Sequence, residues 1–101
     1  RAADIFMIDA HHVGGIDAWK RAADIATSAF RPFVTHLSPE IAVHLAAGIN
    51  GVKTVEFMPW SFNLWEKPMD INSEGELIVP QEPGLGVTLN EDLVKSNQMD
   101  V

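Results

Sequence analysis

The sequence predicts an α/β fold in which parallel strands alternate with helices. Three observations support this fold class. Segments of strand length lie near residues 5–8, 33–36 and 53–57, and the first of them is a continuous apolar run. The two intervening segments, near residues 16–30 and 39–49, carry apolar residues at helical spacing. The connections are short, so the order strand, helix, strand, helix, strand indicates right-handed βαβ units and a parallel sheet.

The first strand and the first helix are recognised by a change in the spacing of apolar residues along the sequence. Residues 5–8 form a continuous apolar run, which is typical of a strand buried on both faces, and Asp9 ends this run. Helical spacing begins after the Gly14-Gly15 pair, and Pro32 ends the helix. The expected buried stripe of this helix is Ile16, Trp19, Ala23, Ala26 and Phe30.

The second strand and helix have clearer boundaries. Residues 33–35 form a short strand with His36 at its end. Ser38 is the expected N-cap of the next helix, and Pro39 suits its first turn. The expected buried stripe of that helix is Ile41, Leu45 and Ile49. The Asn50-Gly51 pair then precedes the third expected strand.

Each expected strand has a titratable residue at or near its carboxyl end: Asp9, His36 and Glu56. In parallel α/β folds, ligands bind at this edge of the sheet. An imidazole beside a carboxylate is an acid–base unit, because the carboxylate orients the ring and stabilises its charged form. We therefore expect His36 to carry a proton, Asp9 to orient it, and Glu56 to supply a hydrogen bond to an oxygen that gains charge.

Other interpretations of these residues remain open. A lone aspartate, histidine or glutamate at such a position is typically a turn former, a structural side chain or a solvated one. The pair His11-His12 resembles a metal site, but adjacent residues on an extended segment point in opposite directions. There is no Gly-x-Ser-x-Gly, phosphate-loop or Gly-x-Gly-x-x-Gly motif to support a hydrolase, NTPase or dinucleotide-binding protein.

Composition excludes further classes and divides the chain. The 101 residues carry a net charge of −7, which argues against nucleic-acid binding, and no apolar run is long enough to span a membrane. The absence of cysteine excludes disulfides, thiolate nucleophiles and cysteine-bound zinc. Six acidic and five basic residues nearly cancel over residues 1–58, whereas eight acids outweigh two bases over residues 59–101. The second part therefore reads as an irregular acidic tail.

Several motifs in their order along the chain resemble the C-terminal end of the enolase superfamily, in its mandelate racemase branch. They are Asp9-Ala10 followed by Gly14-Gly15, then His36-Leu37 with Glu40 and His44-Leu45-Ala46-Ala47, then Glu56, and then Pro83-Gly84-Leu85-Gly86. The resemblance covers essentially the whole chain. It implies the C-terminal part of a TIM-type (β/α) barrel, with strands six to eight in residues 1–58. Residues 59–101 would form the closing segment, which packs towards an N-terminal capping domain outside this chain.

The resemblance also implies a chemistry. The parent protein would be a Mg²⁺-dependent enzyme that abstracts the proton α to a carboxylate and forms an enediolate, with the magnesium ligands in parts of the protein outside this chain. His36, Asp9 and Glu56 would be its catalytic residues in this segment. Trp60 would contribute to substrate binding, although a tryptophan at such a position is also typical of a packing residue.

An acid-sugar dehydratase is the preferred activity, and a racemase or epimerase of a 2-hydroxy acid is the alternative. The expected partner is a small-molecule carboxylate, with neither nucleic acid nor membrane involved. The complete protein is expected to be a cytoplasmic homo-oligomer. A different class also stays open, in which the chain is a catalytically inert fragment or a binding module.

Overall fold

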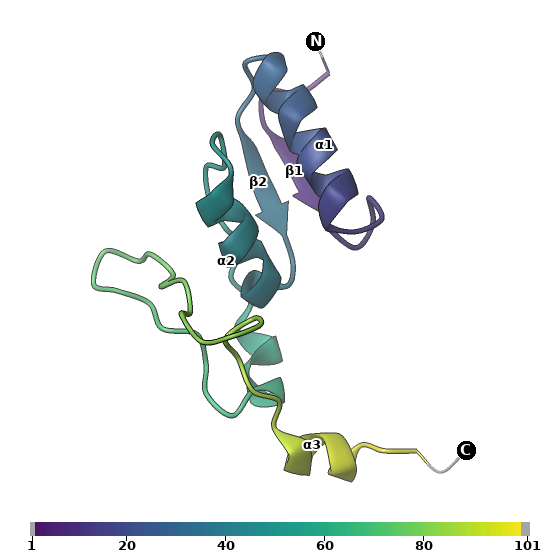
Figure 1. Ribbon diagram of the computed structural model, residues 1–101, viewed down its shortest axis with the longest axis vertical. Helices are drawn as coiled ribbons and strands as arrows, with labels where there is room; N and C mark the ends of the chain where they lie inside the picture. The colour runs from purple at the N-terminus through teal and green to yellow at the C-terminus, as the bar shows by residue number, and fades with distance from the viewer. Residues whose placement is uncertain (1, 100–101) are drawn as a thin grey trace. The chain divides into compact units, whose positions relative to one another are not determined.

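The computed structural model describes residues 2–99. The chain divides into two compact units, with the boundary between Phe57 and Met58. The first unit contains strand β1 (Phe6–Asp9), helix α1 (Ile16–Ser28), strand β2 (Phe33–His36) and helix α2 (Pro39–Gly48). The second contains the 3₁₀ helix η1 (Pro59–Leu64) and helix α3 (Glu91–Ser96). Figure 1 shows these elements along the chain.

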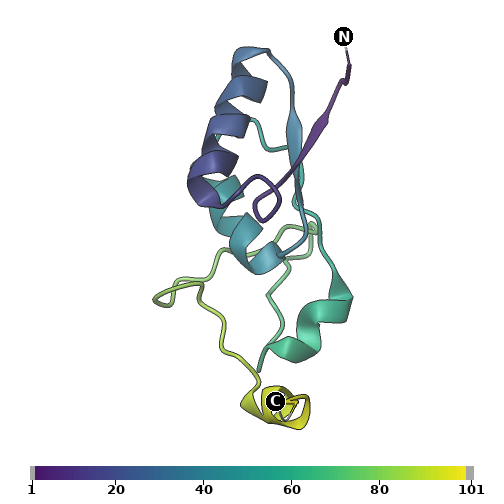
Figure 2. The same cartoon turned by 90° about the vertical axis from the view of Figure 1, so that its right-hand side faces the viewer.

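The two strands of the first unit are parallel, as predicted. Their register pairs Phe6 with Phe33 and Asp9 with His36. Figure 2 shows α1 and α2 on the same side of the strands. The register places the last residues of β1 and β2 directly beside each other, which brings the expected acid–base pair together at the carboxyl edge of the sheet.

The third strand, expected over residues 53–57, is absent as a strand from the described part of the chain. The segment does start beside β2 in parallel orientation, because Phe33 donates to Gly51 O and accepts from Lys53 N. A regular parallel ladder would continue with Thr35 N donating to residue 53, but Thr35 donates to Thr54 O instead. The ladder therefore slips by one residue, and only the single bridge between Phe33 and Val52 remains.

The core of the first unit is small and lies between the strands and α1. It consists of the buried residues Ile8, Trp19, Ala23, Ala26 and Phe33. The Trp19 ring meets the Phe33 ring edge-on at 5.6 Å, and its indole N–H donates to the buried carbonyl of Ile8 at 3.0 Å. The small alanines let α1 approach the sheet closely.

Several residues expected in the core are exposed. Residues 5–7 of the first apolar run are exposed, so β1 is not buried on both faces in this chain. Ile16 is exposed at the start of α1, and Phe30, 93% exposed, lies beyond the end of the helix in a positive-φ conformation. The helical stripe thus ends one turn earlier than predicted, because the backbone leaves the helix at Ser28.

Helix α2 buries a different face from the predicted one. Ala42 and Val43 are buried, whereas the expected stripe of Ile41, Leu45 and Ile49 is half-buried. Leu45 and Ile49 still pack against the core cluster. The physical reason is that α1 already covers this cluster, so α2 reaches only its margin.

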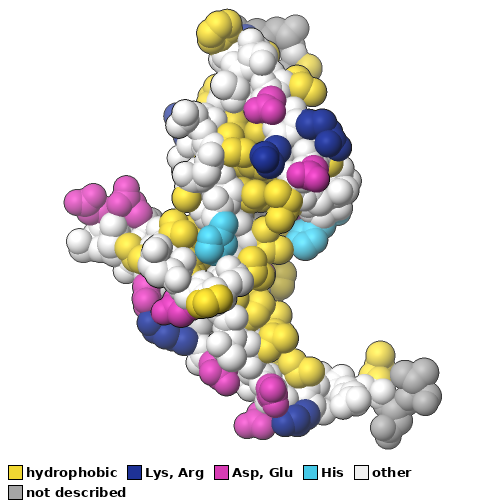
Figure 3. Space-filling model, in the orientation of Figure 1, with side chains coloured by type: hydrophobic (Ala, Val, Ile, Leu, Met, Phe, Trp, Pro, Cys, Tyr) yellow, Lys and Arg dark blue, Asp and Glu magenta, His cyan; other side chains and the backbone are white. Residues whose placement is uncertain are grey.

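The second unit is irregular, as the composition predicts. Two isolated antiparallel bridges join Trp65 to Leu89 and Ile71 to Leu77. Helix α3 is capped by Asn90, whose side chain accepts from Leu93 N at 3.1 Å. Figure 3 shows acidic side chains at the surface of this unit, with exposed hydrophobic side chains among them. Within residues 2–99, every helix is too short or too polar to cross a membrane.

Candidate active site

The site is built on the paired ends of β1 and β2. The Oδ2 atom of Asp9 lies 2.5 Å from Nδ1 of His36. The other carboxylate oxygen, Oδ1, accepts the backbone N–H groups of His11 at 2.7 Å and His12 at 2.9 Å. Both oxygens of a buried carboxylate are therefore hydrogen-bonded, and the predicted contact between Asp9 and His36 is present in the structure.

These contacts determine the charge of Asp9. The hydrogen bond to His36 is the largest of several effects that lower the pKa of Asp9 from 3.8 to about 2. The N–H groups of His12 and His11 and the charge of the His12 ring lower the pKa further, while burial opposes them. Asp9 is thus a carboxylate at neutral pH, and it orients His36 through Nδ1. The opposite ring nitrogen, Nε2, belongs to a side chain that is 31% exposed.

Glu56 contacts the turn that follows His36. Its Oε2 atom accepts the backbone N–H of Leu37 at 2.7 Å, and its own N–H donates to Oγ1 of the buried Thr35 at 3.1 Å. The structure therefore brings Glu56 next to the Asp9–His36 pair, where one of its carboxylate oxygens holds the backbone. The expected hydrogen bond from Glu56 to a reacting oxygen stays a prediction.

The turn after His36 has an unusual backbone. Leu37 and Ser38 both have positive φ angles, 55° and 43°, although neither is glycine. Ser38 occupies the predicted N-cap position of α2, but its side chain makes no capping hydrogen bond. Its left-handed backbone departs from the extended N-cap geometry, and its hydroxyl instead lies 2.8 Å from Nε2 of His11.

His11 and His12 are the contributors to the site that the sequence argument missed. Both donate their backbone N–H groups to Asp9. In addition, the centroid of the His12 ring lies 6.4 Å from the centroid of the His36 ring. The available signal was Asp9 itself, because an aspartate at a strand end commonly accepts backbone N–H groups two or three residues ahead. That pattern predicts the loop, but it does not predict the side-chain contact to Ser38.

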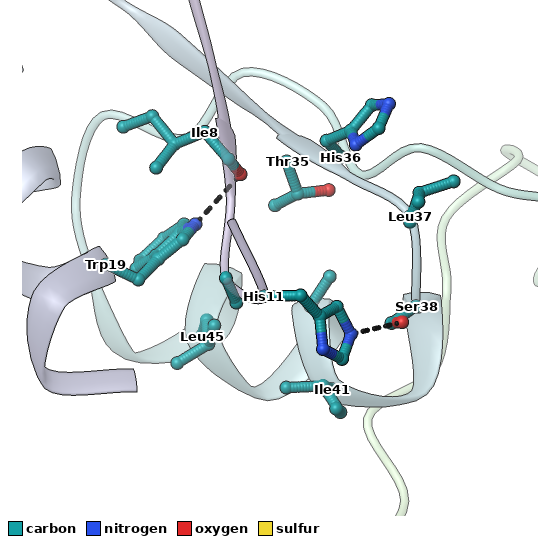
Figure 4. A pocket seen from close by; sticks show the side chains of 11 residues that line it. Ile8, His11, Trp19, Thr35, His36, Leu37, Ser38, Ile41 and Leu45 are labelled. Atoms are coloured by element: carbon teal, nitrogen blue, oxygen red, sulfur yellow. Dashed lines mark hydrogen bonds between the residues drawn. The ribbon is translucent and has the colours of Figure 1, made fainter. Parts of the chain in front are cut away.

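A small cavity of about 10 Å³ lies behind the site, within the first unit. Figure 4 shows His11, Thr35, His36 and Ser38 around it, together with apolar side chains from α1 and α2. Its volume suits at most one water molecule, so it cannot hold an organic substrate.

The remaining expectations concern Trp60 and a metal. Trp60 is 73% exposed on η1 in the second unit, and its role in substrate binding stays a prediction. Among residues 2–99, no group of three or more histidine, aspartate or glutamate side chains could hold a metal ion. The described residues thus do not by themselves fit a magnesium site.

Comparison with known proteins decides the family. The family model described as "Enolase C-terminal domain-like" matches residues 1–93. The chain belongs to this family. Its predicted resemblance to the mandelate racemase branch is confirmed by similarity to a mandelate racemase/muconate lactonizing enzyme from Polaromonas sp. JS666. That structure is 37% identical with a TM-score of 0.83, over 94% of this chain and 26% of that chain.

Two further relatives are acid-sugar enzymes by name. The D-xylonate dehydratase of Haloferax volcanii is 27% identical over 108 residues, which cover 99% of this chain and 26% of the relative. The L-talarate dehydratase of Polaromonas sp. JS666, solved with Mg and L-glucarate, is 37% identical with a TM-score of 0.83, over 94% of this chain and 26% of that chain. The chain therefore spans about a quarter of the length of these relatives.

Proposed function

We propose that this chain supplies the histidine–aspartate pair of a larger Mg²⁺-dependent enzyme that removes the proton α to a carboxylate, and that this enzyme is an acid-sugar dehydratase. The observation that carries the proposal is the 2.5 Å contact between Asp9 and His36 at the carboxyl ends of adjacent parallel strands. The relatives named as dehydratases of sugar acids support the substrate class.

The geometry suits both halves of a dehydration. With Nδ1 engaged by Asp9, Nε2 of His36 either accepts the α-proton or donates a proton to the departing 3-hydroxyl, which leaves as water. In both roles Asp9 remains ionised and stabilises the imidazolium. The alternative, racemisation or epimerisation, uses the same pair to exchange a proton on one face of the substrate, so the chemistry of His36 is shared.

Other parts of the proposal concern the rest of the protein. Residues 1–58 would complete a (β/α) barrel as its last βα units, residues 59–101 would close it, and Trp60 would contact substrate. Magnesium would be bound by residues outside this chain. The complete enzyme would be a cytoplasmic homo-oligomer acting on a small carboxylate, without nucleic acid or membrane.

The test is α-proton exchange in the complete enzyme. D-xylonate and L-talarate, after which the relatives are named, would each be incubated with enzyme in deuterium oxide. ¹H NMR would follow loss of the α-proton and formation of a 2-keto product. His36→Asn should slow exchange by about 10²-fold or more, the usual contribution of a general base. Magnesium binding, measured by calorimetry, should be unchanged.

A matched control is His44→Asn, which changes a histidine on α2 outside the Asp9–His36 contact. It should leave exchange close to that of the unmodified enzyme. Unchanged exchange in His36→Asn would overturn the proposal. Exchange without net loss of water would select the racemase or epimerase instead.

A further inference from the structure

His11 links the loop that follows Asp9 to the turn that follows His36. Its backbone N–H donates to Oδ1 of Asp9 at 2.7 Å, and its ring Nε2 lies 2.8 Å from Oγ of Ser38. Figure 4 shows this ring facing Ser38 beside the cavity, with the contact drawn as a dashed line. One residue thus touches the carboxylate of the pair and also the turn that follows its imidazole.

That turn needs external contacts to keep its shape. Two successive non-glycine residues, Leu37 and Ser38, have left-handed backbone angles, which L-residues other than glycine adopt only with strain. The Leu37 N–H is held by the Glu56 carboxylate at 2.7 Å, which comes from one side of the turn. The Ser38 side chain is held by His11, from the β1–α1 loop. The hydroxyl makes this contact instead of capping α2.

We propose that His11 is a positioning residue, and that its contact with Ser38 keeps the turn after His36 left-handed and so keeps Nδ1 of His36 on Asp9. The inference rests on the proposed function, because the pair is what the contact would serve. His36 is the last residue of β2, so the turn at residues 37–38 directly adjoins the residue that carries the imidazole. The neutral imidazole of His11 can donate to or accept from a serine hydroxyl, so the contact is compatible with either tautomer.

The test compares His11→Ala, His11→Gln and Ser38→Ala in the complete enzyme. The glutamine side chain places an amide group near the position of Nε2, so it can restore a hydrogen bond to Ser38. The first readout is the low-field ¹H NMR signal of the His36 Nδ1 proton, which reports the hydrogen bond to Asp9 without any turnover. The second is kcat for α-proton exchange, measured separately from KM.

Loss of the contact should broaden the Nδ1 proton signal and lower kcat by about two- to tenfold, the range of a single hydrogen bond. KM should change little, because neither His11 nor Ser38 is placed on the substrate. Ser38→Ala should match His11→Ala, the double variant should lose no more than either, and His11→Gln should restore both readouts. If His11→Ala fails to fold, Ser38→Ala alone tests the same contact.

Two results would overturn the inference: an unchanged Nδ1 signal in His11→Ala and Ser38→Ala, or equal losses in His11→Ala and His11→Gln. Failure of the proposed function looks different. In that case His36→Asn leaves exchange unchanged, while the Nδ1 signal still responds to His11→Ala. The spectroscopic readout therefore separates the contact from the reaction that it serves.

Discussion

At the scale of single residues, Asp9 carries the clearest electrostatic signature of the site. Its pKa in the folded chain is about 2, below the 3.8 of an unperturbed aspartate. Because the folded value is the lower one, Asp9 contributes stability that is fully present above about pH 4 and is lost as the pH falls towards 2. The contribution is about 2 kcal/mol at neutral pH.

A titration tests this assignment. The ¹³C signal of the Asp9 carboxyl group in the folded protein should show a midpoint near pH 2. His36→Ala should move that midpoint towards 3.8, because the largest cause of the shift is removed, while the N–H groups of His11 and His12 still favour the carboxylate. An Asp9 midpoint that stays the same in His36→Ala would contradict the role of the hydrogen bond.

The sequence was sufficient to predict the pair but not the contacts around it. Asp9 and His36 each lie at the end of a predicted strand, and parallel pairing then places them side by side. The N-cap position of Ser38 was predicted correctly but its side-chain cap was not, because its backbone is left-handed and its hydroxyl contacts His11, while Glu56 accepts the N–H of Leu37. Those partners lie up to 27 residues away, so no local pattern reveals them.

At the scale of elements, the strands and helices followed from spacing, and the errors came from packing. The boundaries of α2 were predicted to within one residue, yet its buried face was not, because that face depends on how much core α1 leaves uncovered. The third strand was mispredicted because a slipped register at residues 53–54 has no signature in a run such as Lys53-Thr54-Val55.

A glycine pair in the second unit provides a matched test of packing. A Cβ on Gly86 would lie 2.2 Å from Cβ of Pro80, whereas a Cβ on Gly84 would meet nothing within 4 Å. Both have positive φ, 68° and 78°. Gly84→Ala should therefore cost only the backbone strain, about 1–2 kcal/mol. Gly86→Ala should cost a further ~1–3 kcal/mol of overpacking.

Hydrogen exchange of the Asn90 amide measures this difference. That N–H donates to Leu64 O at 2.8 Å within the same unit, so its protection reports local opening. Protection should fall more in Gly86→Ala than in Gly84→Ala. Equal protection in the two variants would show that the loop moves away from Pro80 without cost.

At the scale of the whole molecule, the described chain exposes more large hydrophobic residues than it buries. Residues 5–7 are the most consequential of these, because they lie in or next to β1 at the edge of a two-stranded sheet. An exposed apolar strand edge is a template for association. The relatives contain about four times as much chain, which is consistent with a first unit that needs further segments to cover this edge.

We therefore expect the isolated 101-residue chain to associate at micromolar concentration and to show no turnover, because the described residues contain no metal site. Sedimentation velocity should show species larger than the 11.1 kDa monomer.

Met7→Lys, at a side chain on β1 that is 59% exposed, should reduce association by placing a charge on the strand edge. Ile25→Lys adds the same charge at a 71% exposed position on α1 and should have a smaller effect. Cooperative unfolding of an 11.1 kDa monomer by the unmodified chain would refute the expectation, and equal effects of the two lysines would assign association to net charge instead of to β1.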